Sequence, residues 1–153
     1  MGTFEMRLQS LGLQLPVIPT PKGSYLPYQW SNGLLYVSGQ LSIISGGDQK
    51  LGPLTHQFDL EEATTAAQIA CLNTLSTIKR AIGNLDCVKR FVFLNGYVQA
   101  EQGFADSPKV INGASDLLLK VFGEKGGHAR AAIAVAGLPL NATVEIQVSL
   151  EVK

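Results

Sequence analysis

A strict alternation of apolar and polar residues near the C-terminus constrains the fold most. From Thr143 to Val152, every second residue is apolar and the residues between them are polar or charged. Because successive side chains of a β-strand point to opposite faces, this segment is predicted to be a half-buried strand. Glu145 lies on its polar side and therefore points away from the helix-packed core.

The preceding segment places an arginine in a run of small residues. Arg130 follows Gly127 and His128 and opens an alanine-rich strand pattern. Packing explains an arginine poorly at this position, so we interpret Arg130 as a ligand-binding residue, with a surface or interface ion pair as the alternative. For Glu145 two interpretations stay open: a catalytic carboxylate, or a solvated group paired across subunits.

Length and charge limit the class of protein. The chain has 153 residues, 46% of them hydrophobic, and 12 basic residues balance 12 acidic ones. We predict one domain over residues 1–153, in which residues 1–22 form an N-terminal helix and an extended connector. No Lys/Arg cluster supplies a phosphate-neutralising surface, which argues against nucleic-acid binding. No apolar run approaches the roughly 20 residues of a membrane span, and polar residues interrupt the N-terminus, so a cytoplasmic protein is expected.

The cysteines and histidines are too few for a metal centre. Cys71 and Cys87 show no CxxC or Cys/His spacing, and His56 and His128 are far apart in the chain. Two reduced structural cysteines and no metal or other cofactor are therefore expected.

Helical periodicity and end signals predict three helices. The longest starts after Asp59, which forms a capping box with Glu62, and ends at Gly83. Another covers residues 107–122, and we expect an interruption at Asn112 and Gly113. A short helix near the N-terminus, capped by Thr3, is expected to be peripheral.

Strand patterns complete a mixed α+β order. Residues 34–37, 41–44 and 88–98 read as strands, and residues 51–54 as a short additional one. The order predicts a mixed sheet with two helices on one face. The opposite face stays open, and exposure of Phe91 or Phe93 there predicts closed oligomerisation through that face.

Several separated motifs together resemble a known family. Tyr25, Ser38-Gly39-Gln40, Asn112, Ala129-Arg130, Leu138-Pro139 and Val144-Glu145-Ile146 resemble the YjgF/RidA superfamily, also known as endoribonuclease L-PSP, in order and nearly in spacing. The N-terminal helix and the prolines that follow it resemble its somewhat longer, poorly characterised branch. The resemblance implies a chorismate-mutase-like fold, a homotrimer with clefts between subunits, and hydrolysis of enamine or imine intermediates such as 2-aminoacrylate to a 2-keto acid and ammonia.

The resemblance also implies roles for individual residues. Arg130 would bind the substrate carboxylate through two parallel hydrogen bonds, and Glu145 would orient or deprotonate the attacking water. Tyr25 would form a wall and Ser38 would hydrogen-bond the nitrogen or the water, with a backbone-bonding role as the alternative for Ser38. Gly39 would let the backbone approach the ligand closely, and Asn112 would order the cleft. Ala132 would contribute its backbone carbonyl.

Two positions depart from the family pattern. His128 stands where deaminase-type members usually have proline, and Ala132 where they often have cysteine.

Two functions other than imine hydrolysis stay open. A non-catalytic protein that binds small carboxylate metabolites is the first alternative. Endoribonuclease activity is the second, and the balanced charge argues against it.

Overall fold

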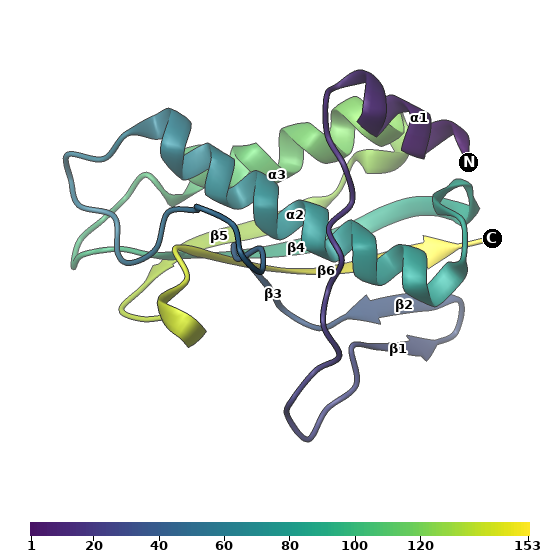
Figure 1. Cartoon of the computed structure of the whole chain (residues 1–153), viewed down its shortest axis with the longest axis horizontal. Helices are drawn as coiled ribbons and strands as arrows, with labels where there is room; N and C mark the ends of the chain where they lie inside the picture. Colours follow the sequence, from purple (N-terminus) through teal and green to yellow (C-terminus); the bar gives the residue numbers. More distant parts are fainter.

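All helices lie on one face of a single sheet. The computed structural model describes residues 1–153, and Figure 1 shows the helices above the strands. The chain belongs to the α+β class, and the predicted mixed sheet with two long helices on one face is confirmed. None of the helices is both long and apolar enough to span a bilayer. The elements are α1 (Thr3–Ser10), β1 (Tyr28–Ser31), β2 (Leu34–Val37), β3 (Gln40–Leu41), α2 (Leu60–Ile82), β4 (Val88–Gln99), α3 (Ser107–Phe122), β5 (Ala129–Val135) and β6 (Val144–Val152), with 3₁₀ turns at Leu85–Cys87, Gly123–Gly126 and Pro139–Asn141.

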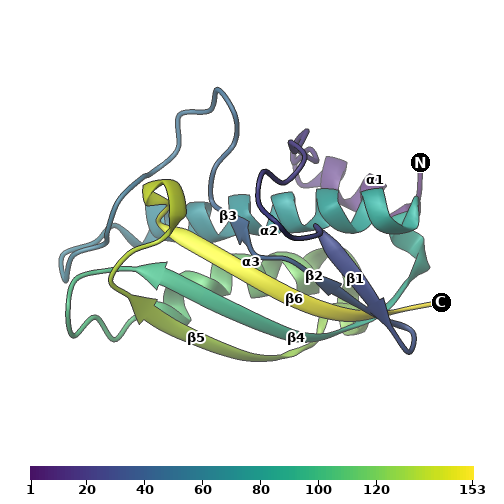
Figure 2. The same ribbon diagram turned by 90° about the horizontal axis from the view of Figure 1, so that it is seen from below.

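The strand order puts β5 at an edge of the sheet. The order is β1-β2-β6-β4-β5, and β3 also pairs with β6. Only β4 and β5 run parallel, because the α3 crossover connects them. Seen from the uncovered side in Figure 2, β5 lies along one margin and α2 and α3 lie behind the sheet. The edge position leaves one side of β5 without a partner strand in the chain.

The two long helices pack closely on the sheet. The Asp59 carboxylate accepts a hydrogen bond from the Glu62 backbone N–H at 2.9 Å, as the end signals predicted for α2. The expected interruption of α3 at Gly113 is wrong, because α3 is continuous. A Cβ at Gly113 would lie 2.2 Å from the Thr64 carbonyl oxygen of α2. Gly113 therefore permits the close approach of the two helix backbones.

Two expectations for the N-terminal helix are corrected. Thr3 does not cap α1 with its side chain; instead, the Asp86 carboxylate accepts hydrogen bonds from the backbone N–H groups of Thr3 (2.9 Å) and Phe4 (3.1 Å). The helix is not merely peripheral, since Phe4 and Leu8 are buried in the core. The connector after α1 then crosses α2 (Figure 1), where the Ser76 hydroxyl donates to the Pro16 carbonyl at 2.7 Å.

The predicted strand set was incomplete. β1 was missed, although it forms a hairpin with β2 around Asn32 and Gly33, both of which have positive φ. The strand expected over residues 41–44 is reduced to β3, because Ser42 turns inward and its hydroxyl accepts from the Val144 N–H at 3.0 Å. Leu51 and Leu54 form isolated bridges rather than a strand.

The uncovered face of the sheet carries exposed apolar side chains. Phe91 is buried on the helix side, whereas Phe93, Tyr36 and Ile133 are 38%, 47% and 51% exposed. The strand register aligns Tyr36 and Phe93 with Ser149, and Ile133 with Tyr97, on the same face as Glu145. Such a surface is typical of a protein interface.

Candidate functional site

Four of the predicted site residues line one open cavity on the uncovered face. The cavity has a volume of about 560 Å³ and lies where β6 begins. Tyr25, Ser38, Gly39 and Glu145 come from separate segments and converge here. Their neighbours complete the walls: Tyr97, Leu138, Pro139 and Gln147.

Glu145 has the chemistry of a base that lacks a partner. Its carboxylate makes no hydrogen bond or ion pair within the chain, and burial raises the pKa of Glu145 above its ordinary value. A Cβ placed on Gly39 would lie 2.5 Å from Glu145 Oε2, so the absence of a side chain at Gly39 makes room for the carboxylate. A partly desolvated carboxylate that faces an open cavity is suited to accept a proton from water.

Ser38 and Tyr25 belong to the wall of this cavity. The Ser38 hydroxyl donates to the Leu26 carbonyl at 2.5 Å, and the Ser38 N–H donates to the Pro27 carbonyl at 2.9 Å. These bonds hold the segment that carries Tyr25, which is 58% exposed. The Ser38 proton is therefore directed to the backbone, and its oxygen remains able to accept a bond from a ligand.

Arg130 lies in a second cluster, between β5 and α3. Its Nη1 donates to Ser115 Oγ at 3.1 Å and its Nη2 donates to the Pro108 carbonyl at 3.2 Å. No carboxylate pairs with the half-buried guanidinium, so the ion-pair alternative does not occur within the chain. Asn112 is four residues after Pro108 and three before Ser115, and it therefore shares their face of α3. Ala132 follows Arg130 on the same side of β5.

Sequence reasoning missed Ser115, which links Arg130 to His128. Ser115 Oγ is 2.9 Å from His128 Nε2, and His128 Nδ1 is 2.7 Å from the Gly126 carbonyl oxygen. The spacing of Ser115 from Pro108 along a helix was the available signal. It became informative only once α3 was known to lie beside Arg130.

Within one chain the two clusters lie on opposite faces of the sheet. Arg130 aligns with Leu94, which is buried under the helices, whereas Glu145 aligns with Tyr97 on the uncovered face. A single protomer therefore does not bring the guanidinium and the carboxylate together. Because β5 is an edge strand, the Arg130 cluster lies at a margin of the sheet.

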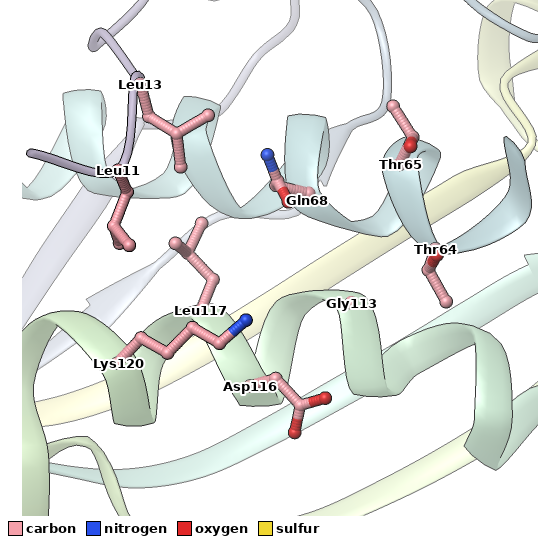
Figure 3. Close-up of a pocket in the computed structure, with 9 residues that line it drawn as sticks. All are labelled: Leu11, Leu13, Thr64, Thr65, Gln68, Gly113, Asp116, Leu117 and Lys120. Carbon is pink, nitrogen blue, oxygen red and sulfur yellow. The ribbon is translucent and has the colours of Figure 1, made fainter. Parts of the chain in front are cut away.

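Two other hollows lie outside these clusters, and only one of them is next to the Glu145 cavity. A groove of about 310 Å³ between α2 and α3 is shown in Figure 3, where Lys120 extends along α3 and Asp116 points away from α2. The groove brings no catalytic group together and lies on the helical face. A cavity of about 390 Å³ lies instead next to Glu145, because Tyr25 and Gly39 line both that cavity and the Glu145 cavity.

Known proteins match this chain over almost its whole length. Residues 5–152 match the family model described as "YjgF/chorismate mutase-like, putative endoribonuclease". Protein TCP17 of Trypanosoma cruzi is 41% identical and the match covers 98% of this chain and 94% of the relative. The crystal structure of Atu1372 from Agrobacterium tumefaciens, a protein of unknown function, is 41% identical with a TM-score of 0.88 over 98% of this chain and 92% of that one. A structure described as a putative endoribonuclease from Shewanella oneidensis has a TM-score of 0.92 and 34% identity, covering 99% and 100% of the two chains.

Proposed function

Because the chain belongs to the YjgF/chorismate mutase-like family, we propose that it hydrolyses reactive imines and enamines of amino acid metabolism, of the 2-aminoacrylate type. The products would be a 2-keto acid and ammonia. One observation carries the proposal: the molecule holds a half-buried guanidinium and a half-buried carboxylate, and neither has a charged partner within the chain. The guanidinium matches the negative charge of the substrate carboxylate, and the carboxylate can accept the proton that the attacking water loses.

The proposed active form is a homotrimer with its sites between subunits. The exposed side chains of Tyr36, Phe93 and Ile133 support association through the uncovered face, which would remove them from water. Association would also allow the Arg130 cluster of one copy to approach the Glu145 cavity of the next. The small carboxylate metabolite would then bind across the interface.

The reaction needs no covalent nucleophile or cofactor in this proposal. Arg130 would hold the carboxylate of the 2-imino acid through those guanidinium N–H groups that do not donate to α3. Glu145 would take a proton from a water molecule as the oxygen attacks the C=N carbon. Glu145 would return this proton to the nitrogen to give a carbinolamine. It would then move the hydroxyl proton to the nitrogen as the carbonyl forms and the C–N bond breaks to release ammonia. An enamine would first tautomerise to the imine by protonation at its terminal carbon.

The decisive assay uses 2-aminoacrylate generated in place. A pyridoxal-phosphate-dependent serine dehydratase supplies the intermediate, and semicarbazide competes for it while keto acid release is followed. We expect acceleration over buffer by the wild-type chain. Glu145→Gln should lower kcat about 10²–10⁴-fold, the usual range for a general base, and Arg130→Ala should lower kcat/KM about 10–100-fold.

A surface arginine provides the matched control. Arg90 is exposed and pairs with Glu151 at 2.9 Å, away from both clusters. Arg90→Ala should leave the rate unchanged. Keto acid release equal to that of buffer, by the wild-type and Arg130→Ala chains alike, would refute deaminase activity.

The same variants separate the two alternative functions. A non-catalytic metabolite-binding protein would bind 2-keto acids in calorimetry in an Arg130-dependent way and show no turnover. Endoribonuclease activity, named in the family description, is less well supported because the chain has no net charge and no basic cluster. Cleavage of RNA by highly purified protein, abolished by Glu145→Gln, would establish it instead.

A further inference from the structure

The cavity beside Glu145 is lined by several separate parts of the chain, and its apolar side chains come from the connector, from β3 with the segment after it, and from Leu140. Its volume is about 390 Å³, and it lies among the connector, the segment after β3 and one face of α2. The apolar side chains in its walls include Val17, Ile18, Leu41, Ile43, Ile44 and Leu140. The space far exceeds what the two-carbon skeleton beside the carboxylate of 2-aminoacrylate would need.

Two of the polar side chains around this cavity, Asn73 and Arg80, are used to build its walls. Asn73 Nδ2 donates to the carbonyls of Leu41 and Ile43, both at 2.8 Å. Arg80 Nη2 donates to the Ile18 carbonyl at 2.7 Å. These bonds fasten the connector and the segment after β3 to α2. They leave apolar surface as the main feature presented to a ligand, which favours a hydrocarbon group.

The cavity is adjacent to the proposed reaction site. Tyr25 and Gly39 line both hollows, and the Glu145 carboxylate lies against Gly39. A substrate whose imine carbon lies near Glu145 would therefore have its side chain directed past Tyr25. We propose that this cavity binds the apolar side chain of a 2-imino acid, so that branched aliphatic substrates are preferred to alanine-like ones. This inference rests on the proposed function.

The test compares two imines that differ only in the side chain. An amino acid oxidase generates 2-iminopropanoate from alanine and 4-methyl-2-iminopentanoate from leucine. Three additional carbons in an apolar site should raise kcat/KM roughly tenfold or more. Ile43→Trp, which fills the cavity, should remove this preference and leave the alanine-derived imine unaffected.

A control and a second variant keep the result interpretable. Ile69 is a half-buried isoleucine of α2 that lines a different hollow, so Ile69→Trp should change neither rate. Leu140 is 76% exposed, and Leu140→Trp narrows the same cavity from the surface if Ile43→Trp does not fold. Equal rates with both imines, unaltered by either cavity variant, would overturn the subsite while leaving the deaminase intact.

Binding distinguishes the remaining outcomes. If neither imine is hydrolysed, the proposed function fails, and calorimetry with pyruvate and 4-methyl-2-oxopentanoate still tests the subsite. Tighter, Ile43-dependent binding of the larger acid supports it, and equal or absent binding of the two acids overturns it. A change of oligomeric state in Ile43→Trp without any change in ligand preference would show that a second copy covers the cavity, which also overturns it.

The hydrogen bonds of Arg130 carry a second inference from different observations, which also rests on the proposed function. The Gly126 carbonyl can only accept, so His128 Nδ1 carries a proton and, in the neutral ring, Nε2 is an acceptor. The Ser115 hydroxyl then donates to Nε2 at 2.9 Å and accepts from Arg130 Nη1 at 3.1 Å. The chain of bonds has one consistent direction, from Arg130 to Gly126.

We infer that Ser115 and His128 are positioning residues for Arg130. With Nη2 held by Pro108, the guanidinium is attached to α3 at two points, and three of its five donors remain for a ligand. Ser115 is only 7% exposed, so water does not readily replace its bond. Preorganisation of this kind lowers the entropic cost of binding a carboxylate.

Two substitutions of His128 separate positioning from simple packing. Glutamine places an amide near the position of Nε2, which Ser115 can use, whereas asparagine replaces only the Nδ1 donor. His128→Gln should keep KM within about threefold of the wild type, while His128→Asn and Ser115→Ala should raise KM and the Kd for a 2-keto acid about three- to tenfold with little change in kcat.

The control removes a hydroxyl elsewhere on the helical layer. Thr65→Ala deletes a hydroxyl that donates only to the Glu61 carbonyl of its own helix, and it should not alter KM. Identical behaviour of the His128→Gln and His128→Asn chains would overturn the inference. So would unchanged affinity in Ser115→Ala, or a wild-type chain that binds no 2-keto acid.

Discussion

Removal of the Asp86 carboxylate should weaken the attachment of the first helix to the core. Asp86 caps α1 across the fold, with bonds to the N–H groups of Thr3 and Phe4. A helix cap contributes about 1 kcal/mol and charged acceptors about 1.5–3 kcal/mol per bond at most, reduced here by solvent. We therefore expect Asp86→Ala to lower the free energy of unfolding by about 1–2 kcal/mol. For a chain of this size the loss corresponds to a Tm about 3–6 °C lower.

The effect should depend on pH in a defined direction. The backbone hydrogen bonds from Thr3 and Phe4 hold the pKa of Asp86 below its ordinary value of 3.8. A carboxyl group with a lowered pKa in the folded state stabilises that state fully at pH values above its unfolded pKa. This stabilisation is lost as pH falls through the folded pKa. The difference between the wild type and Asp86→Ala should therefore be present at pH 7 and shrink below about pH 4.

Urea unfolding and calorimetry at matched protein concentration measure the effect. A fixed concentration is needed because association would add to the apparent stability. Asp48→Ala is the control, since Asp48 lies in an exposed loop and makes no hydrogen bond or ion pair within the chain. A stability of Asp86→Ala within about 0.3 kcal/mol of the wild type at pH 7 would refute the reasoning, because surface substitutions commonly fall in that range. A pH-independent difference would refute the assignment of the effect to the ionised carboxylate.

Three further predictions concern close contacts and the candidate base. Gly113→Ala should lower the free energy of unfolding in urea by about 1–3 kcal/mol, because the new Cβ would lie 2.2 Å from the Thr64 backbone oxygen, whereas Gly137→Ala, with nothing within 4 Å, should be tolerated. Gly39→Ala should leave Tm nearly unchanged, because Glu145 can rotate away from a Cβ 2.5 Å from its Oε2, yet lower kcat about tenfold in the imine assay; unchanged kcat would contradict this. The raised pKa of Glu145 predicts that kcat/KM falls on acidification through a pKa above 4.5, and that Glu145→Gln lacks this limb in a pH–rate profile.

Local sequence patterns were sufficient to predict the helices and strands that contact the core along one face. The apolar stripe of α2, the Pro108 and Gly123 signals around α3 and the alternation of β6 each lie within one segment, and the structure confirms all three. The Asn32-Gly33 pair was a local hairpin signal that was overlooked, so β1 was predictable in principle.

Distant contacts account for the errors. Thr3 had the chemistry of a cap, but the carboxylate that caps α1 comes from Asp86, 83 residues away. Ser42 lies in an apolar run, yet its bond to Val144 ends β3 early. Gly113 appeared to be a helix breaker, and only the position of α2 shows that its missing side chain is required.

For the candidate site, the sequence by itself determined the residue types: one arginine in a small-residue strand and one glutamate on a polar strand face. Periodicity assigns a side chain to a face, because it depends only on neighbouring residues. The tertiary structure alone decided that Tyr25, Ser38 and Gly39 join Glu145, and that Arg130 bonds to α3 on the other side of the sheet. Such groupings depend on strand order and helix packing, which arise from contacts between segments far apart in the chain and leave no periodic trace in any one of them.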